Sequence, residues 1–229
     1  MSASVFKVAV IGAGTMGNGI AHVFAQSGHE VALIDVNAAA LDRAQATIER
    51  NLDRLVAKER ISAEDKAATL SRLKTSSEMH GAVSDADLVV EAATERLDLK
   101  LKIFEQIDAS APANAILATN TSSISITRIA AATGRPDKVI GMHFMNPVPI
   151  MKLVEVIRGY DTSDATTAAV VALSQQLGKI PVEVHDYPGF VANRILMPMI
   201  NEAICSLHEG VAGVAEIDQV MKLGMAHPM

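Results

Sequence analysis

The stretch that decides the fold is residues 5–35, VFKVAVIGAGTMGNGIAHVFAQSGHEVALID. It begins with an apolar run of strand length, Val5–Ile11, which is too short for the core and cleavage site of a signal peptide. A segment of helical period, Met16–Ser27, follows, and a second apolar run, Glu30–Asp35, closes the stretch. This order of strand, glycine-rich turn, helix and strand predicts a βαβ unit.

Three glycines in the turn form the pattern GxGxxG, at Gly12, Gly14 and Gly17. In dinucleotide sites the first permits a tight turn, the second lets the backbone approach a pyrophosphate, and the third lets helix and strand pack closely. Asp35, 18 residues after Gly17, can accept hydrogen bonds from an adenosine ribose and would repel a 2′-phosphate. The pattern therefore predicts an NAD site. The alternative is an ordinary glycine-rich turn capped by Asp35.

Apolar runs of strand length alternate with segments of helical period along most of the remaining chain. Such alternation is typical of a parallel sheet covered by helices on both faces. We predict an α/β fold with a Rossmann-type, doubly wound, mostly parallel sheet. Further strands are expected at Leu88–Ala92, Ala115–Thr119, Val139–Phe144, Leu153–Ile157 and Pro181–Val184, and further helices at Leu99–Ala109, Ile124–Ala132 and Ser163–Leu177.

The chain is predicted to divide into a Rossmann domain, residues 1–186, and the first part of an all-α domain, residues 187–229. The strand-length runs stop at this boundary, and Phe190–Glu209 and Ala215–Leu223 both have helical periods. We expect the all-α domain to be cut short, because residues 227–229 resemble the middle of a loop.

Composition and charge exclude several classes of protein. With 49% hydrophobic and 20% charged residues, the 229-residue chain is that of a globular protein. A net charge of −6 argues against general binding to nucleic acid or to a membrane surface. The apolar stretch Phe190–Leu207 contains charged and amide side chains that would be costly in lipid. A single cysteine, Cys205, and the lack of a signal peptide predict a cytoplasmic protein.

The segment 141–155, GMHFMNPVPIMKLVE, carries the candidate catalytic pair. His143 ends one expected strand and Glu155 lies in the next, and a proline-stiffened hairpin can bring the two side chains together. Histidine is suited to proton transfer near neutral pH, and a carboxylate on its far nitrogen fixes the tautomer. The alternative is a structural histidine and a surface glutamate. We predict no metal site.

A helical insertion is expected at residues 38–72, with a break near Ser62 that has the composition of a helix start. Its first helix places basic side chains on one face, apolar side chains on the opposite face and acidic side chains between them. This segregation favours an anionic ligand over a merely solvated face. The basic residues are Arg43, Arg50, Arg54 and Lys58, and the apolar residues are Leu41, Ile48, Leu52 and Leu55.

Five stretches resemble the 3-hydroxyacyl-CoA dehydrogenase family, and in particular its bacterial 3-hydroxybutyryl-CoA dehydrogenases. They run in family order over essentially the whole chain, so they are far more specific than GxGxxG alone. The stretches are IGAGTMGNGIA from Ile11, VVEAATE from Val89, ATNTSSISIT from Ala118, GMHFMNPVPIMKLVEVIRG from Gly141 and YPGFVANRIL from Tyr187.

The resemblance implies roles for individual residues. His143 matches the family's catalytic base and Glu155 its partner, while Ser122 and Asn193 match residues that hydrogen-bond substrate oxygens and cofactor. Ser122 has the alternative role of capping the helix at 124–132, and Asn193 that of capping or packing the helix that follows it. Beside the three glycines and Asp35, the implied cofactor contacts are Thr15, Met16, Glu95, Lys100, Ser122 and Asn146.

In the resembling family the helical insertion binds coenzyme A. The residues of the insertion that this implies as substrate contacts are Asn51, Arg54 and Lys58. The basic face would suit the 3′-phosphate and pyrophosphate of the coenzyme.

The resemblance implies NAD-dependent oxidation of the 3-hydroxyl of an acyl-CoA, such as 3-hydroxybutyryl-CoA, and the reverse reduction of acetoacetyl-CoA. It also implies a homodimer for the full-length parent. Two alternatives stay open: a dehydrogenase of a non-CoA hydroxy acid of the gulonate type, and a catalytically silent NAD-binding protein of the lambda-crystallin type. Met145 stands where many relatives have Phe, which leaves the preferred acyl length open.

Overall fold

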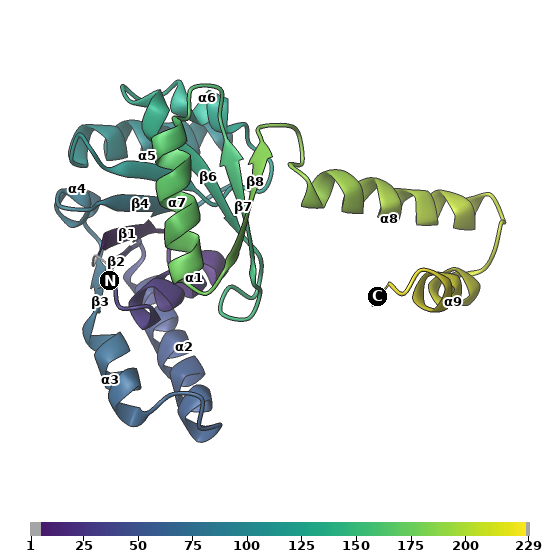
Figure 1. Ribbon diagram of the computed structural model, residues 1–229, viewed down its shortest axis with the longest axis horizontal. Coiled ribbons are helices and arrows are strands. Elements are labelled where there is room, and N and C mark those ends of the chain that lie inside the picture. The colour runs from purple at the N-terminus through teal and green to yellow at the C-terminus, as the bar shows by residue number, and fades with distance from the viewer. Residues whose placement is uncertain (1–5, 228–229) are drawn as a thin grey trace. The chain divides into compact units, whose positions relative to one another are not determined.

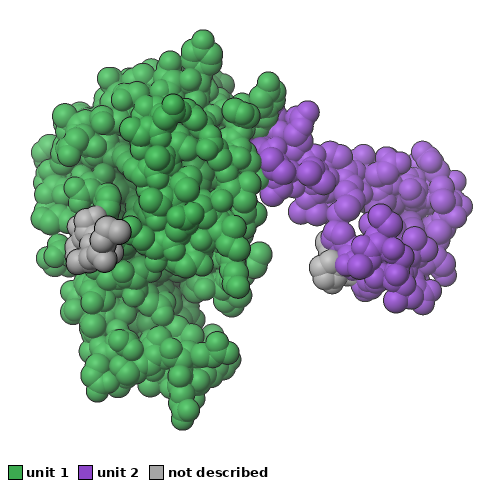
Figure 2. Space-filling model, viewed as in Figure 1, with its two compact units in different colours: residues 1–187 green, residues 188–229 purple. Residues whose placement is uncertain are grey.

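The structure is a computed structural model that describes residues 6–227. The chain forms two compact units, Met1–Tyr187 and Pro188–Met229 (Figure 2). The first unit contains the sheet and the helices that cover it, and the second is helical (Figure 1). Each unit is described by itself below.

The sheet of the first unit has eight strands in the order β3-β2-β1-β4-β5-β6-β7-β8. Strands β1 to β6 pair in parallel, β7 is antiparallel to β6, and β8 is parallel to β7. The predicted Rossmann-type, mostly parallel sheet is confirmed. The strands are β1 Lys7–Ile11, β2 Glu30–Ile34, β3 Leu73–Ser76, β4 Leu88–Glu91, β5 Ile116–Thr119, β6 Val139–Phe144, β7 Leu153–Arg158 and β8 Ile180–His185.

Helices lie on both faces of this sheet (Figure 1). The apolar sides of α1, α2 and α7 pack with the inner strands in one core, in which Val10, Leu33, Leu88 and Phe24 are fully buried, and Phe104 and Ile107 of α5 are buried outside this cluster. The strands are apolar on both faces because both are covered. The helices are α1 Thr15–Gln26, α2 Ala38–Ala57, α3 Ala63–Ser71, α4 Met79–Val83, α5 Leu97–Ser110, α6 Ile126–Ala130 and α7 Asp164–Gln176, with a 3₁₀ turn at Pro136–Lys138.

Strand β3 and helix α4 were absent from the predicted elements, and the strand that follows the insertion is β3 rather than Leu88–Ala92. The four residues of β3, LKTS, include one buried side chain, Leu73. Because β3 is an edge strand, Lys74 and Thr75 remain exposed. A short polar edge strand lacks the apolar run by which the inner strands are recognised.

The insertion is a hairpin of α2 and α3. Ser62 begins α3 with a capping box, in which its hydroxyl accepts the Asp65 N–H at 3.0 Å and the Asp65 carboxylate accepts the Ser62 N–H at 3.0 Å. The predicted break near Ser62 is therefore confirmed. Lys66 of α3 pairs with Asp53 at 2.5 Å and with Glu49 at 3.4 Å. The acidic side of α2 thus faces α3. This contact explains why the acidic and basic side chains of α2 lie on separate faces.

The second unit contains α8 Ala192–His208 and α9 Val214–Gly224. Apolar side chains of the two helices line a groove of about 620 Å³, including Ile200, Ile204, Leu207, Val214 and Ile217. No helix within residues 6–227 is both long and apolar enough to cross a membrane.

The core of the first unit contains a histidine that we expect to make folding pH-dependent. His22 of α1 is 1% exposed, and neither ring nitrogen has a hydrogen-bond partner among residues 6–227. Burial, and secondarily the charge of Lys179, lower the pKa of His22 from 6.5 to about 4. The unfolded chain therefore takes up a proton as pH falls below about 6.5, whereas the folded chain resists it until about pH 4. Stability is fully present above pH 6.5, and about 3 kcal/mol should be lost toward pH 4.

Urea unfolding at pH 7.5, 6, 5 and 4 measures this effect. The His22→Leu variant should lose less stability than the parent over this range, by about 3 kcal/mol. The matched control is His80→Leu, which removes an exposed histidine. Parallel pH profiles for the parent and His22→Leu would contradict the prediction.

Candidate active site

The glycine loop joins β1 to α1 at the carboxyl edge of the sheet. Gly12 has a φ of +98°, and a side chain there would lie 2.6 Å from Ala93 Cα. A side chain at Gly17 would lie 1.7 Å from Gly12 O, so Gly17 lets α1 pack on the loop. By contrast, nothing lies within 4 Å of a side chain placed on Gly14. The loop is thus packed at its first and third glycines and open at its second.

Asp35 follows β2 and lies beside this loop. One carboxylate oxygen accepts the Ala13 N–H at 2.8 Å and the other accepts the Asn37 N–H at 2.9 Å. The side chain is partly exposed, so it keeps lone pairs for a ribose hydroxyl. Thr15 and Met16 form the start of α1, where backbone N–H groups lack partners within the helix.

His143 and Glu155 are direct partners in the antiparallel pairing of β6 and β7. His143 Nδ1 and Glu155 Oε2 lie 2.7 Å apart, and the residues are 6% and 2% exposed. The structure thus brings the predicted pair together as a buried hydrogen-bonded pair. The other ring nitrogen, Nε2, lies 3.1 Å from Ser122 Oγ.

Ser122 is held by backbone and side-chain contacts in the loop after β5. Its N–H donates to Glu95 Oε1 at 2.9 Å, and the neighbouring Thr121 hydroxyl donates to Glu95 Oε2 at 2.7 Å. Helix α6 is capped instead by Ser125, whose side chain accepts the Arg128 N–H. The capping role considered for Ser122 therefore belongs to Ser125, and α6 begins two residues later than expected.

A buried charged cluster supports the loops that carry Glu95 and Ser122. Lys100 and Glu91 form an ion pair that is 1% and 0% exposed. The Thr119 hydroxyl donates to Glu91 Oε2 at 2.9 Å, and Glu91 Oε1 accepts the Ala93 N–H at 2.9 Å. Because the ammonium of Lys100 is enclosed, any contribution that it makes to cofactor binding passes through Glu91 and these loops.

The loop between β6 and β7 places Asn146 at the surface, three residues after His143. The strands β1, β4, β5 and β6 are parallel, so the loops with Gly14, Glu95 and Ser122, together with His143, meet at one edge of the sheet. This edge lies where the strand order reverses, between β1 and β4, which is where open α/β sheets bind ligands.

Two groups of predicted residues lie outside this cluster. The basic face of α2 is exposed at Arg43, Arg50 and Arg54 and continues at Lys58, the C-cap residue of the helix, and Asn51 beside it is half-buried. Leu41, Ile48 and Leu52 on the opposite face are buried, as expected. Asn193 lies in the first turn of α8, in the second unit, and the residue at the N-cap of that helix is Val191.

Residues 7–187 match the model of the 3-hydroxyacyl-CoA dehydrogenase NAD-binding domain, and residues 189–229 match the model of the C-terminal domain. The 3-hydroxybutyryl-CoA dehydrogenase of Bradyrhizobium diazoefficiens is 52% identical over 229 residues, which are all of this chain and 78% of that protein. This chain belongs to the 3-hydroxyacyl-CoA dehydrogenase family. It is an NAD-dependent oxidoreductase of 3-hydroxyacyl-CoA.

Two further relatives are similar to this dehydrogenase over nearly its whole length. The 3-hydroxybutyryl-CoA dehydrogenase of Clostridioides difficile is 50% identical over 223 residues, 97% of this chain and 79% of that protein. The crystal structure of the (S)-3-hydroxybutyryl-CoA dehydrogenase of Ralstonia eutropha matches with a TM-score of 0.95 and 55% identity. The match covers 98% of this chain and 79% of the crystal structure's chain.

The loop geometry of this dehydrogenase fits NAD. The space beside Gly14 admits a pyrophosphate at the N-terminus of α1, and Asp35 lies where an adenosine ribose would follow. Among residues 6–227, no group of three or more His, Cys, Asp or Glu side chains could hold a metal ion.

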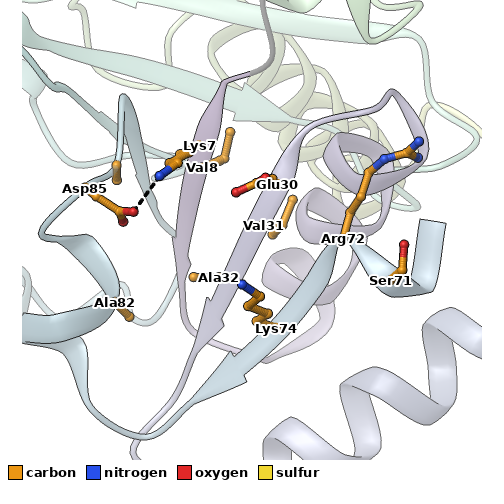
Figure 3. Close-up of a pocket in the computed structure, with 11 residues that line it drawn as sticks. Lys7, Val8, Glu30, Val31, Ala32, Ser71, Arg72, Lys74, Ala82 and Asp85 are labelled. Carbon is orange, nitrogen blue, oxygen red and sulfur yellow. Dashed lines mark hydrogen bonds and ion pairs between the residues drawn. The ribbon is translucent and has the colours of Figure 1, made fainter. Parts of the chain in front are cut away.

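A hollow at the opposite edge of the sheet is distinct from this site (Figure 3). It measures about 330 Å³ and lies at the amino ends of β1 and β2, beside Lys7 and Glu30. Lys7 pairs there with Asp85 at 2.8 Å. The hollow contains none of the predicted site residues.

The residues that sequence analysis missed are Glu91 and Thr119, which were within the matching stretches but received no role. Glu91 is the one charged residue of β4, in the sequence LVVE. A charge in a buried strand needs a partner, and this signal could have identified its pairing with Lys100.

Proposed function

We propose that this chain interconverts 3-hydroxybutyryl-CoA and acetoacetyl-CoA with His143 as the general acid and base. The observation that carries the proposal is the buried His143–Glu155 pair, with Ser122 on the other ring nitrogen. The choice of a four-carbon acyl group is supported by the names of the relatives at about 50% identity. The intact pair also favours an enzyme over a silent NAD-binding protein of the lambda-crystallin type.

His143, Glu155 and Ser122 have different roles in the proposed proton transfer. The Glu155 carboxylate accepts a hydrogen bond from Nδ1–H of His143, which leaves Nε2 unprotonated and directed at Ser122 Oγ. Nε2 takes the proton of the substrate 3-hydroxyl, and Glu155 stabilises the resulting imidazolium. Bound NAD supplies the acceptor for the hydride that leaves C3. Ser122 holds the substrate oxygen beside Nε2, and Asn193 is proposed to contact the substrate as well.

The basic face of α2 is proposed to bind the phosphates of coenzyme A. Its four cations are exposed, and none of them forms an ion pair within residues 6–227. They therefore remain available for an anionic ligand. Because the chain has a net charge of −6, it needs such a local group of positive charges to bind an anion.

Acetoacetyl-CoA-dependent oxidation of NADH tests this function, with free acetoacetate as the competing substrate. We expect turnover of the CoA ester only, and Arg54→Gln should raise its KM about fivefold with kcat unchanged because a phosphate contact adds uniform binding. The matched control is Lys102→Gln, which removes an exposed cation from α5. Equal rates with free acetoacetate would favour a non-CoA dehydrogenase of the gulonate type, and no turnover of either would favour the silent protein.

We also propose that the protein acts as a cytoplasmic homodimer through its helical part. The exposed apolar side chains of α8 and α9, such as Ile204 and Val220, support an interface there. The proposed boundary of the NAD-binding domain is residue 186, beside Tyr187 at the end of the first compact unit.

A further inference from the structure

Lys179 is a buried cation that the mechanism above does not use. It lies between α7 and β8 and is 8% exposed. Its Nζ donates to Val148 O at 2.5 Å and to Met151 O at 2.8 Å. No carboxylate within residues 6–227 forms an ion pair with it. Two backbone carbonyls thus stabilise a charge that proteins seldom bury unpaired.

The two carbonyls belong to the loop that joins the strands of the catalytic pair. This loop leaves β6 directly after His143–Phe144 and enters β7 two residues before Glu155. Inside it, the N–H groups of Ile150 and Met151 both donate to Pro147 O, at 3.0 and 2.9 Å. The contacts of Lys179 therefore hold a compact turn that also carries Asn146.

The same loop packs against the cofactor helix. A side chain placed on Gly19 of α1 would lie 2.9 Å from Val148 Cβ, so the bare glycine lets Val148 approach the helix. Val148 is 2% exposed. One turn further along α1, His22 is close enough for the charge of Lys179 to lower its pKa. Lys179 thus lies where α1, the β6–β7 loop and β8 meet.

We propose that Lys179 is a positioning residue for hydride transfer. By holding the carbonyls of Val148 and Met151, it keeps the β6–β7 loop against α1, and thereby aligns the His143–Glu155 pair and Asn146 with a dinucleotide bound at the start of that helix. The inference rests on the proposed role of His143. A displacement of the order of 1 Å between reacting groups can lower a rate about 100-fold. Loosening this loop should therefore lower the rate constant of hydride transfer.

The test is a single-turnover experiment with the full chain, in which enzyme with bound NADH is mixed with acetoacetyl-CoA. Lys179→Met should lower the rate constant of NADH consumption at least tenfold, while the Kd for NADH changes less than threefold. The matched control is Arg135→Met, which also removes a cation that binds backbone carbonyls, Pro112 O and Asp108 O, at the far end of β6. It should lower thermal stability without changing the single-turnover rate.

A second variant perturbs the same loop from the helix side. Gly19→Ala introduces a methyl group against Val148 and should lower the single-turnover rate at least threefold with Lys179 in place. This variant decides the matter if Lys179→Met does not fold. If Lys179→Met folds and its single-turnover rate is unchanged, the inference is overturned. If Lys179→Met does not fold, an unchanged rate in Gly19→Ala overturns it instead. If the parent consumes no NADH with acetoacetyl-CoA, the proposed function fails and the inference fails with it.

Discussion

Replacing His143 by Gln is expected to lower kcat for acetoacetyl-CoA reduction about 10³-fold, because the transferring proton loses its donor and acceptor. Glutamine cannot exchange a proton near neutral pH, although it can still form hydrogen bonds to Glu155 and Ser122. The Kd for NADH should stay within about threefold of the parent, since the glycine loop is untouched. Steady-state kinetics and NADH fluorescence titration measure the two quantities.

The companion variant Glu155→Gln separates orientation from proton transfer. Its amide oxygen can accept the hydrogen bond from Nδ1, but it cannot stabilise an imidazolium by charge. We expect a loss in kcat of about 10²-fold, smaller than that of His143→Gln. If both variants retain more than a third of the parental kcat, the pair is structural and the general base lies elsewhere.

Replacing Lys100 by Met is expected to destabilise the first unit by about 3–5 kcal/mol, because it leaves the Glu91 carboxylate buried without its cation. The loops after β4 and β5 depend on Glu91, through the Ala93 N–H and the Thr119 hydroxyl. NADH binding should therefore weaken as well, even though Lys100 itself is enclosed. Differential scanning calorimetry and NADH titration measure the two effects.

Removing the charge of Glu91 provides the internal control for this variant. In Glu91→Gln/Lys100→Met the glutamine oxygen can still accept the Ala93 N–H, and no unpaired charge remains, so most of the lost stability should return. Lys102→Met, two residues along α5, should change stability by less than about 0.5 kcal/mol. A double variant no more stable than Lys100→Met would show that packing, rather than charge, is decisive at this position.

The fold could be predicted because its signals are local. Residues 5–35 contain a strand, a glycine turn and a helix within one continuous stretch, and each apolar run was long enough to be recognised. The pairing of His143 with Glu155 could be predicted for the same reason, since both lie on one hairpin. The edge strand β3 could not, because burying one side chain of four leaves almost no hydrophobic pattern.

Apart from the Glu91–Lys100 pair, the supporting contacts of the site could not be predicted because they join residues far apart in sequence. Glu91 and Thr119 are 28 residues apart, and Lys179 is 31 residues from Val148. Sequence periodicity indicates which residues are buried, but it contains no information on which buried polar groups meet. The capping role of Ser125 was missed for a smaller reason: Ser122, Ser123 and Ser125 are chemically alike, and only the backbone shows which of them begins α6.

His143 and Glu155 face each other in the pairing of β6 and β7, so the residues that transfer the proton are held by the strands, whereas Met145 lies in the loop between them. Backbone pairing sets the distance between the acid–base partners, so side chains of the intervening loop can change without moving the two apart, provided that the contacts of Lys179 with the Val148 and Met151 carbonyls are kept. A substitution at Met145 is then expected to change the preferred acyl length independently of the base. An enzyme engineer could therefore vary position 145 for new substrates, leave the rest of the loop unchanged and keep the proton-transfer machinery intact.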